Sequence, residues 1–513
     1  MEHLVFLTGR LAEPSLHKVL ASLGVPTRSS GTSAASGATE ASLATDTSLA
    51  PTSSASASTA TAGATEPLFS YEVIELGLQV AGLMTADMIR RRLAPERLAG
   101  SADTPSVDRL IVPGRCRGDL DALSQHYGVP VQRGPEELKD LPQFFKRGGV
   151  APSLDDYRVA IFAEIVDAPR LTVAQIVERA RVLKADGADV IDLGCLPATP
   201  FDHLEDCVRA LKAEGYTVSV DSVSSDELLR GGRAGADYLL SLTVDTLWIA
   251  DEVASIPVLI ARDPQDEAAL YAAIDAMTAR GKPFLADSIL DPLPFGLLAS
   301  LCRYQRLRAA YPQAPIMLGV GNLTELTEAD TSGINAVLLG IAAELDAAAL
   351  LTTQVSAHAR RAVREADWAR RIMHAAHTDR SLPMGYSGAL MTTQDKQPWP
   401  DSADEIAAIA AQVKDPNFRV QVSFEGIHVY NRDGLRRNVD PFELWPQLGL
   451  QDDAGHAFYM GVELARAQIA WQLGKRYVQD QPLNWGAAFE PKPEDLAAWC
   501  APGRTRDKPA KGD

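Results

Sequence analysis

From residue 154 onward the sequence alternates apolar, strand-like runs with amphipathic, helix-like runs, and this alternation most limits how the chain can fold. The first pair is RVAIFAEI followed by TVAQIVERARVLKADG, and the last is NAVLLG, residues 335–340, followed by a helix that begins near Ala342. Eight such pairs fill about 190 residues, and no early GxGxxG turn opens a helix as it would in an open dinucleotide-binding sheet. The sequence therefore predicts an α/β fold built as a closed (β/α)8 TIM barrel.

Three of the expected barrel strands end in an acidic residue. Asp192 lies in VIDLG, Asp221 in TVSVDS and Asp287 in KPFLADS. In a (β/α)8 barrel the carboxyl ends of the strands face one shared mouth, so we expect the three carboxylates to converge there. Each acid taken singly could instead cap the helix that follows it. Three together indicate a binding or catalytic site.

The segments on either side of the barrel predict two further domains. Residues 1–150 also alternate strands and helices, which predicts a small N-terminal parallel α/β domain. Within it, residues from about 27 to 66 are almost entirely Ser, Thr, Ala and Gly, so we expect a disordered insertion there. The barrel is expected over residues 154–376. Residues 377–513 predict a C-terminal α+β region with two short strands around a Gly turn and a disordered tail.

Composition narrows the class of protein. The formal net charge of −18 argues against a broad surface for nucleic acid, which needs clustered Lys and Arg. The five cysteines are scattered without a CxxC pair, so neither disulfides nor zinc are expected. The N-terminus lacks the basic start of a secretion signal, and no apolar run reaches the roughly 20 residues that span a bilayer. We expect a cytoplasmic protein that does not enter membranes.

The motifs GADVIDLG, VSVDS, LADS and MLGVGN, in this order on a barrel, resemble the pterin-binding family. That family includes dihydropteroate synthases and methyltetrahydrofolate-dependent methyltransferases. Together with FLTGRLAEP and VPGRCRGD, they resemble the dihydropteroate synthase-like proteins of archaea and methylotrophic bacteria, a group linked to tetrahydromethanopterin biosynthesis. The resemblance implies a transferase that joins 6-hydroxymethyl-dihydropterin diphosphate to an arylamine. The amine would be 4-(β-D-ribofuranosyl)aminobenzene 5′-phosphate, and pyrophosphate would leave.

The resemblance also implies roles for residues at the strand ends. Asp221 and Asp287 would hold the pterin's 2-amino-4-oxo edge during catalysis, since its N–H donors call for carboxylates. Asn322, in GVGN, would add an amide near the ring nitrogens. Ser241 stands where the family usually has an asparagine. Asp192 would sit deeper and orient its neighbours.

A metal ion and a set of basic residues would neutralise the leaving diphosphate. Glu164 and Asp167, in FAEIVDAP, are the candidates for Mg2+, because carboxylates suit this hard cation. The alternative is that both are solvated loop acids. For the anionic groups, the seventh strand lacks the serine-arginine-lysine run of typical synthases, and the expected eighth strand lacks the arginine-valine-histidine run. Arg262 and Arg303 are the remaining barrel candidates, with surface salt bridges as the alternative role.

The flanking domains could supply the missing positive charge instead. The basic turns RCRGD and HVYNRDGLRRN offer further candidates, although a simply solvated basic turn is the favoured interpretation of both. The residues in question are Arg115, Arg117, His428, Arg432, Arg436 and Arg437.

Two other functions stay open. GVGN and FAEI also resemble the pterin-dependent methyltransferase branch, but this chain carries no DxHxxG loop of a cobalamin module. A pterin-binding protein without catalysis is the third interpretation, favoured by the missing lysine and arginine. For the synthase the partners are small-molecule pterin and arylamine substrates, whereas methyl transfer to a corrinoid would need a cobalamin partner. A homodimer is the expected assembly.

Overall fold

A computed structural model of the chain describes residues 2–23, 69–98, 106–136, 138–145 and 153–489. The predicted insertion at about 27–66 and the predicted disordered tail lie outside the described residues. The chain divides between residues 151 and 152 into two compact units. The boundaries of the three predicted domains otherwise stay a prediction.

The first unit is built on a four-stranded parallel sheet in the order β2-β1-β3-β4. Apolar residues on both faces of the sheet pack against helices, as strands buried on two sides require. α1 and α4 contribute to the cluster on one face, and α2 and α3 to the cluster on the other. The elements are β1 Glu2–Thr8, α1 Glu13–Ser22, β2 Phe69–Glu75, α2 Ala86–Arg92, β3 Arg109–Val112, α3 Leu120–Tyr127, β4 Val131–Arg133 and α4 Leu141–Phe145.

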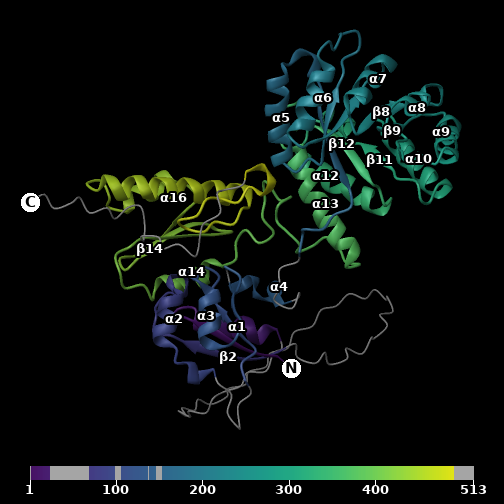
Figure 1. Cartoon of the computed structure of the whole chain (residues 1–513). Coiled ribbons are helices and arrows are strands. Elements are labelled where there is room, and N and C mark those ends of the chain that lie inside the picture. Colours follow the sequence, from purple (N-terminus) through teal and green to yellow (C-terminus); the bar gives the residue numbers. More distant parts are fainter. Residues whose placement is uncertain (1, 24–68, 99–105, 137, 146–152, 490–513) are drawn as a thin grey trace, which may run out of the picture. The chain divides into compact units, whose positions relative to one another are not determined.

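The second unit contains an eight-stranded parallel sheet in the order β10-β9-β8-β7-β6-β5-β12-β11. A bridge between Ala286 and Ile316 joins β10 to the residue that precedes β11 and so closes the ring. Figure 1 shows the helices arranged around these strands. The predicted (β/α)8 barrel is therefore confirmed. Its strands are β5 Ala160–Ile165, β6 Val190–Gly194, β7 Thr217–Asp221, β8 Tyr238–Leu242, β9 Ile256–Leu259, β10 Leu285–Ala286, β11 Met317–Gly319 and β12 Ala349–Thr353.

The barrel interior is a packed core and not a pore. One buried cluster takes Phe162 from β5, Val190 from β6, Met317 from β11 and further residues from β8, β9, β10 and β12. A second, larger cluster fills the space between the strands and the surrounding helices. These helices are α5 Val173–Ala185, α6 Leu204–Ala213, α7 Ser225–Ala234, α8 Ile249–Glu252, α9 Glu267–Ala279, α10 Leu297–Ala310, α11 Gly321–Thr324, α12 Thr331–Glu344 and α13 Ala362–Thr378.

The prediction of the eighth strand was wrong. Residues 335–340 lie inside α12, and the eighth strand is β12, which begins nine residues further on at Ala349. The buried positions of α12, which include Asn335, Leu338, Leu339 and Ala342, recur at helical spacing. A run as apolar as NAVLLGIAA conceals that spacing, because its exposed face is apolar as well.

The C-terminal part of the chain combines helices with a three-stranded antiparallel sheet, in the order β13-β14-β15. The sequence predicted two of these strands, and the third is the charged run GLRRN. None of the described helices is long and apolar enough to cross a membrane. The elements are α14 Ala403–Ala410, β13 Arg419–Ser423, β14 Gly426–Asn431, β15 Gly434–Asn438, α15 Pro441–Leu444 and α16 Ala454–Leu473.

Candidate active site

Three carboxylates meet at the carboxyl ends of the first three barrel strands. Glu164 in β5 pairs in register with Asp192 in β6, and Asp221 ends β7. One oxygen from each carboxylate lies within 4.8 Å of the others. Gly194 makes room for this group, because a Cβ at that position would collide with Oε1 of Glu164. The structure thus brings together two acids predicted for the pterin and one predicted for Mg2+.

Asp192 is the innermost member of this acidic group. It is fully buried, and the hydroxyl of Ser219 donates a short hydrogen bond to its Oδ1. Its Oδ2 is also buried and finds no hydrogen-bond partner among the described residues. Burial, followed by the charges of Asp221 and Glu164, raises the pKa of Asp192 well above its ordinary value. A buried carboxylate oxygen of this kind is costly unless a proton, a cation or a donor satisfies it.

The other two members are also shifted toward the neutral form. Burial raises the pKa of Glu164 to about 7. Burial, with the charges of Glu164 and Asp287, raises the pKa of Asp221 to about 7. The charges that raise the pKa of Asp192 and Asp221 are themselves carboxylates, so the group is suited to a cation or to a ligand rich in N–H donors.

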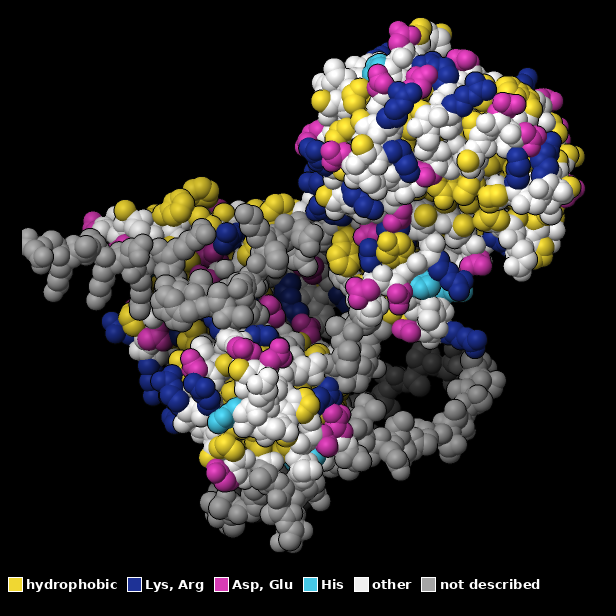
Figure 2. Space-filling view, viewed as in Figure 1, with side chains coloured by type: hydrophobic (Ala, Val, Ile, Leu, Met, Phe, Trp, Pro, Cys, Tyr) yellow, Lys and Arg dark blue, Asp and Glu magenta, His cyan; other side chains and the backbone are white. Residues whose placement is uncertain are grey.

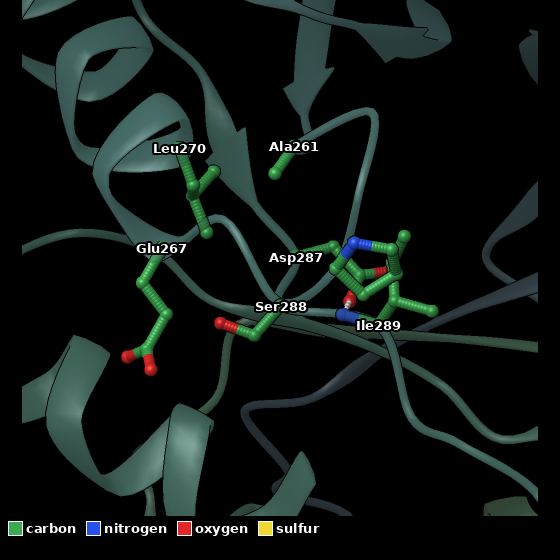
Figure 3. Close-up of a pocket in the computed structure, with 7 residues that line it drawn as sticks. Ala261, Glu267, Leu270, Asp287, Ser288 and Ile289 are labelled. Carbon is green, nitrogen blue, oxygen red and sulfur yellow. Dashed lines mark hydrogen bonds between the residues drawn. The ribbon is translucent and has the colours of Figure 1, made fainter.

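Asp287 follows β10 at the same, carboxyl end of the barrel strands, and its charge helps to raise the pKa of Asp221. Its Oδ1 accepts a short hydrogen bond from the hydroxyl of Tyr304 and a 2.7 Å bond from the backbone N–H of Ile289. Burial raises the pKa of Asp287 to about 6, although these donors and Arg303 oppose the shift. Figure 3 shows Asp287, Ser288 and Ile289 beside a small hollow that Ala261 and other residues also line.

The two predicted phosphate candidates lie in different environments. Arg303, in α10, is only 2% exposed, and its guanidinium donates to the carbonyl oxygens of Ser288 and Ile289 and to Asp291 at 3.0 Å. It therefore supports the loop that carries Asp287 from within the protein. Arg262, after β9, is exposed and contacts no described residue through a hydrogen bond or ion pair.

The remaining predicted residues lie at or near strand ends but outside the acidic group. Asn322 is exposed in α11, and its Nδ2 donates to the carbonyl oxygen of Leu290 at 2.8 Å. Ser241 is half-buried in β8. The carboxylate of Asp167 pairs with Arg179 at 2.8 Å. Of the two predicted metal ligands, therefore, Glu164 belongs to the acidic group and Asp167 does not.

The basic residues of the flanking segments are mostly engaged within their own parts of the chain. Arg115 pairs with Glu136 at 3.7 Å, and Arg437 contacts Glu425. His428 is buried in β14, where its Nε2 lies 2.8 Å from the hydroxyl of Ser423, and so it does not belong to a solvated turn. The others are Arg117, whose backbone N–H bonds to Met84, Arg432, which pairs with Asp433, and Arg436, which donates to Gly434.

Sequence reasoning missed the segment after the true eighth strand. His358 lies there, with its Nε2 3.1 Å from the carbonyl oxygen of Thr324. Arg361 occupies the N-cap position of α13 without a side-chain capping hydrogen bond, and its Nε is buried without a hydrogen-bond partner among the described residues. The run ALLTT, with two apolar leucines followed by two β-branched threonines, was the signal that could have revealed this strand. The arginine-valine-histidine run that the sequence analysis sought at the eighth strand would therefore lie after β12, and not at residues 335–340.

Comparison with known proteins gives three kinds of similarity. Residues 57–136 match a family of unknown function, DUF6513. An uncharacterized protein of Methanocaldococcus jannaschii is 28% identical over 504 residues, which cover 80% of this chain and 95% of that protein.

Solved dihydropteroate synthases are similar at low identity. A Yersinia pestis enzyme with a pterine-sulfa conjugate is 17% identical, over 45% of this chain and 97% of that chain, with a TM-score of 0.34. A Thermus thermophilus enzyme in complex with 4-aminobenzoate is 21% identical, over 44% and 95%, with a TM-score of 0.33. A Xanthomonas albilineans enzyme in complex with 7,8-dihydropteroate is 19% identical, over 44% and 94%, with a TM-score of 0.35.

Proposed function

We propose that the barrel is a pterin-binding transferase that condenses 6-hydroxymethyl-dihydropterin diphosphate with an arylamine. The observation that carries the proposal is the convergence of Glu164, Asp192, Asp221 and Asp287 on one barrel mouth. The motifs around these acids resemble those of the pterin-binding family, which indicates a pterin as the ligand. In the reaction, a C–N bond forms between the amine and the pterin methylene, the C–O bond to the diphosphate breaks, and the amine loses a proton.

In this proposal Asp221 and Asp287 accept hydrogen bonds from the 2-amino group and ring N–H of a pterin. Oδ1 of Asp287 already takes both donors from Tyr304 and Ile289. Oδ2 faces Gly319, where a Cβ would come within 3.7 Å. The anchored carboxylate can therefore present its second oxygen in a defined orientation, which is the positioning that such a reaction requires of a protein.

The acidic group also fits Mg2+ by the chemistry of its donors. Three carboxylates offer the hard oxygen ligands that this ion prefers, and the unsatisfied Oδ2 of Asp192 is a ready ligand atom. Glu164, Asp192 and Asp221 would hold the ion. Bound there, Mg2+ would supply positive charge to the leaving diphosphate.

The arylamine we propose is 4-(β-D-ribofuranosyl)aminobenzene 5′-phosphate, a step of tetrahydromethanopterin biosynthesis. Its phosphate needs a basic partner that p-aminobenzoate does not. Arg262 after β9 and Arg361 after β12 are the candidates, because neither guanidinium is engaged by a described residue. Arginine suits this task because it can bind phosphate in a bidentate manner.

The test is product formation by the purified full chain. The protein is given the dihydropterin diphosphate, Mg2+ and either p-aminobenzoate or the ribosylated amine, and pyrophosphate and product mass are measured. Coupling to the ribosylated amine alone would support both the reaction and the pathway. Pterin binding without product from either amine would favour methyl transfer or a binding role. A protein that fails to bind the pterin in calorimetry would refute the proposal.

Matched variants connect the result to the site. Asp221→Asn keeps the shape of the side chain but removes the charged acceptor, and should abolish coupling. Asp226→Asn makes the same change five residues later, on an exposed carboxylate at the start of α7, and should leave coupling unchanged.

A further inference from the structure

Helix α16 exposes a face that carries no charge. Its buried residues, Met460, Leu464 and Ala467 among them, pack against the C-terminal sheet. The outward face of such a helix normally carries charged side chains, which water solvates well. Here every exposed residue of the helix is uncharged. These residues are Ala454, Gly455, Phe458, Gly461, Ala465, Ile469 and Gln472.

Large apolar side chains lie toward both ends of this face. Near the start of the helix Phe458 is 77% exposed, and α15, which contacts α16, carries the exposed Phe442. Near the other end Ile469 is exposed, and Nε1 of Trp471 donates to the carbonyl oxygen of Phe424, whose side chain is 74% exposed. Figure 2 shows hydrophobic side chains along the surface where Figure 1 places α16. Exposed apolar surface gathered in one region marks a site of interaction with another molecule.

Gly461 lies near the middle of this face, and the packing of the single chain does not require a glycine there. It is the eighth residue of a 20-residue helix, and a Cβ at this position would meet open space. Glycine inside a helix lowers the stability of the helix, but it lets another backbone come close. Ala465, one turn further on, is the next exposed residue and is also small. The face therefore has a shallow middle between bulkier ends.

We propose that this face of α16 is an interface between two copies of the chain, packed antiparallel about a two-fold axis near the middle of the helix. In a two-fold dimer the same surface meets itself, so its pattern has to match its own reverse. Reversal sets Phe458 opposite the partner's Ile469, and Gly461 opposite the partner's Ala465. Two packed helices cross at an angle and are closest at the crossing point, so small residues belong in the middle and bulky ones toward the ends.

The area of this face is sufficient for a specific dimer. A helix of 20 residues is about 30 Å long. Three largely exposed phenylalanines and Ile469 in each copy, with the smaller residues between them, bury on the order of 1,000 Å2 or more in the dimer, which is about what a specific interface needs. The antiparallel arrangement also brings opposite ends of the two helix dipoles together. The interface does not depend on the function proposed for the barrel, so either proposal can fail alone.

Analytical ultracentrifugation of the full chain tests the assembly. The wild type should sediment as a dimer whose fraction rises with concentration. Gly461→Leu puts a bulky side chain at the crossing point and should raise the dimer dissociation constant at least tenfold. Because the position is open in the single chain and leucine is a better helix former, the monomer should unfold at the same temperature or higher. A monomeric wild type, or unchanged dimerisation of Gly461→Leu, would overturn the proposal.

A matched control makes the same change on another helix. Gly333 is exposed in α12, and a Cβ there would also meet open space. Gly333→Leu should therefore leave the dissociation constant unchanged. Ala465→Glu, a second variant of the face, introduces a charge that dimerisation would bury and should also separate the copies. A dimer that is lost with Gly333→Leu but kept with both variants of α16 would place the interface on the barrel and overturn the proposal.

Photo-cross-linking identifies what covers the face and in which direction it runs. A benzophenone amino acid in place of Phe458 keeps an aromatic side chain at this position of the full chain. It should join two copies and reach the partner's Ile469 or its close neighbours. Cross-links within one chain would mean that another segment of the same chain covers the face. Cross-links to the partner's Phe458 would mean parallel packing, and either result would overturn the proposal.

Discussion

Asp287 is kept partly ionised by its neighbours although it is buried. Burial raises its pKa to about 6, while Tyr304 and Ile289 oppose the rise. Tyr304→Phe removes one donor to the carboxylate, so the pKa should rise further and more of the group should be protonated at pH 7. A protonated carboxyl loses acceptor capacity. We expect pterin affinity to fall severalfold at pH 6–7 and to recover by pH 9, measured by calorimetry across this range.

Tyr311→Phe is the matched control for this variant. Its hydroxyl donates to Asp275 at 2.9 Å, away from the strand ends, and the substitution removes the same atom. Its binding curve should follow that of the wild type at every pH. A Tyr304→Phe protein with the same pH profile as the wild type would show that Tyr304 does not tune Asp287.

Substitutions of Glu164 and Asp167 should differ in their effect on Mg2+ binding. Glu164 lies with Asp192 and Asp221, whereas Asp167 pairs with Arg179. Glu164→Gln should therefore weaken the binding of Mg2+, or of Mn2+ as its spectroscopic substitute, by at least tenfold, while Asp167→Asn should not. Direct metal binding by electron paramagnetic resonance measures this without reference to catalysis. The reverse order of the two variants would place the ion outside the acidic group.

The burial of His428 in the C-terminal sheet predicts that the stability of this part of the chain depends on pH. Burial and the charge of Arg437 lower its pKa to about 4. The folded protein thus favours the neutral ring, so this contribution to stability is present above about pH 6.5 and is lost as the pH falls toward 4. Between pH 7 and 5 the loss is on the order of 2 kcal/mol.

His428→Gln should remove most of this loss, because glutamine does not titrate. Denaturant unfolding at pH 7 and pH 5, followed by tryptophan fluorescence, measures the difference for both proteins. Trp399, Trp445, Trp471 and Trp485 all lie in this part of the chain. An unchanged difference between the two pH values in the variant would exclude His428 as its cause.

Helices α12 and α13 pack together through a buried polar contact. The hydroxyl of Thr331 donates to Glu365 at 2.5 Å, and Nδ2 of Asn335 lies 3.3 Å from the same oxygen. Thr331→Val keeps the shape but leaves the buried carboxyl short of a donor, which should cost about 1–3 kcal/mol of unfolding free energy. Thr331→Ser keeps the hydroxyl and should lose less. Equal losses in the two variants would assign the effect to the methyl group and not to the hydrogen bond.

The same helix shows what sequence reasoning could and could not find. Strand alternation predicted the barrel and placed Asp192, Asp221 and Asp287 at strand ends, because these are local patterns that topology brings together. Alternation failed at α12, where a helix apolar on several faces resembles a strand. Tyr304 and Arg303 could not be predicted as partners of the Asp287 loop, since their roles depend on how α10 packs against it. Asp167 looked equivalent to Glu164 in sequence, and only the geometry separates them.

The chain as a whole contains hydrophobic cores that belong to separate units. Leu110 is buried in the core of the first unit and Leu193 in the core around the barrel. Since each unit has its own core, we expect at least two transitions in calorimetry of the full chain. Truncating either leucine to alanine should lower the unfolding free energy of the unit that contains it by about 2–5 kcal/mol.

Each truncation should therefore lower a different transition. Leu110→Ala should lower the midpoint of one transition by several degrees and leave the other in place, and Leu193→Ala should do the opposite. Dihydropterin with Mg2+ should raise only the transition that Leu193→Ala lowers, because a ligand stabilises the unit that binds it. If both truncations moved a single shared transition, the two units would unfold as one body, and a ligand of the barrel would stabilise the whole chain.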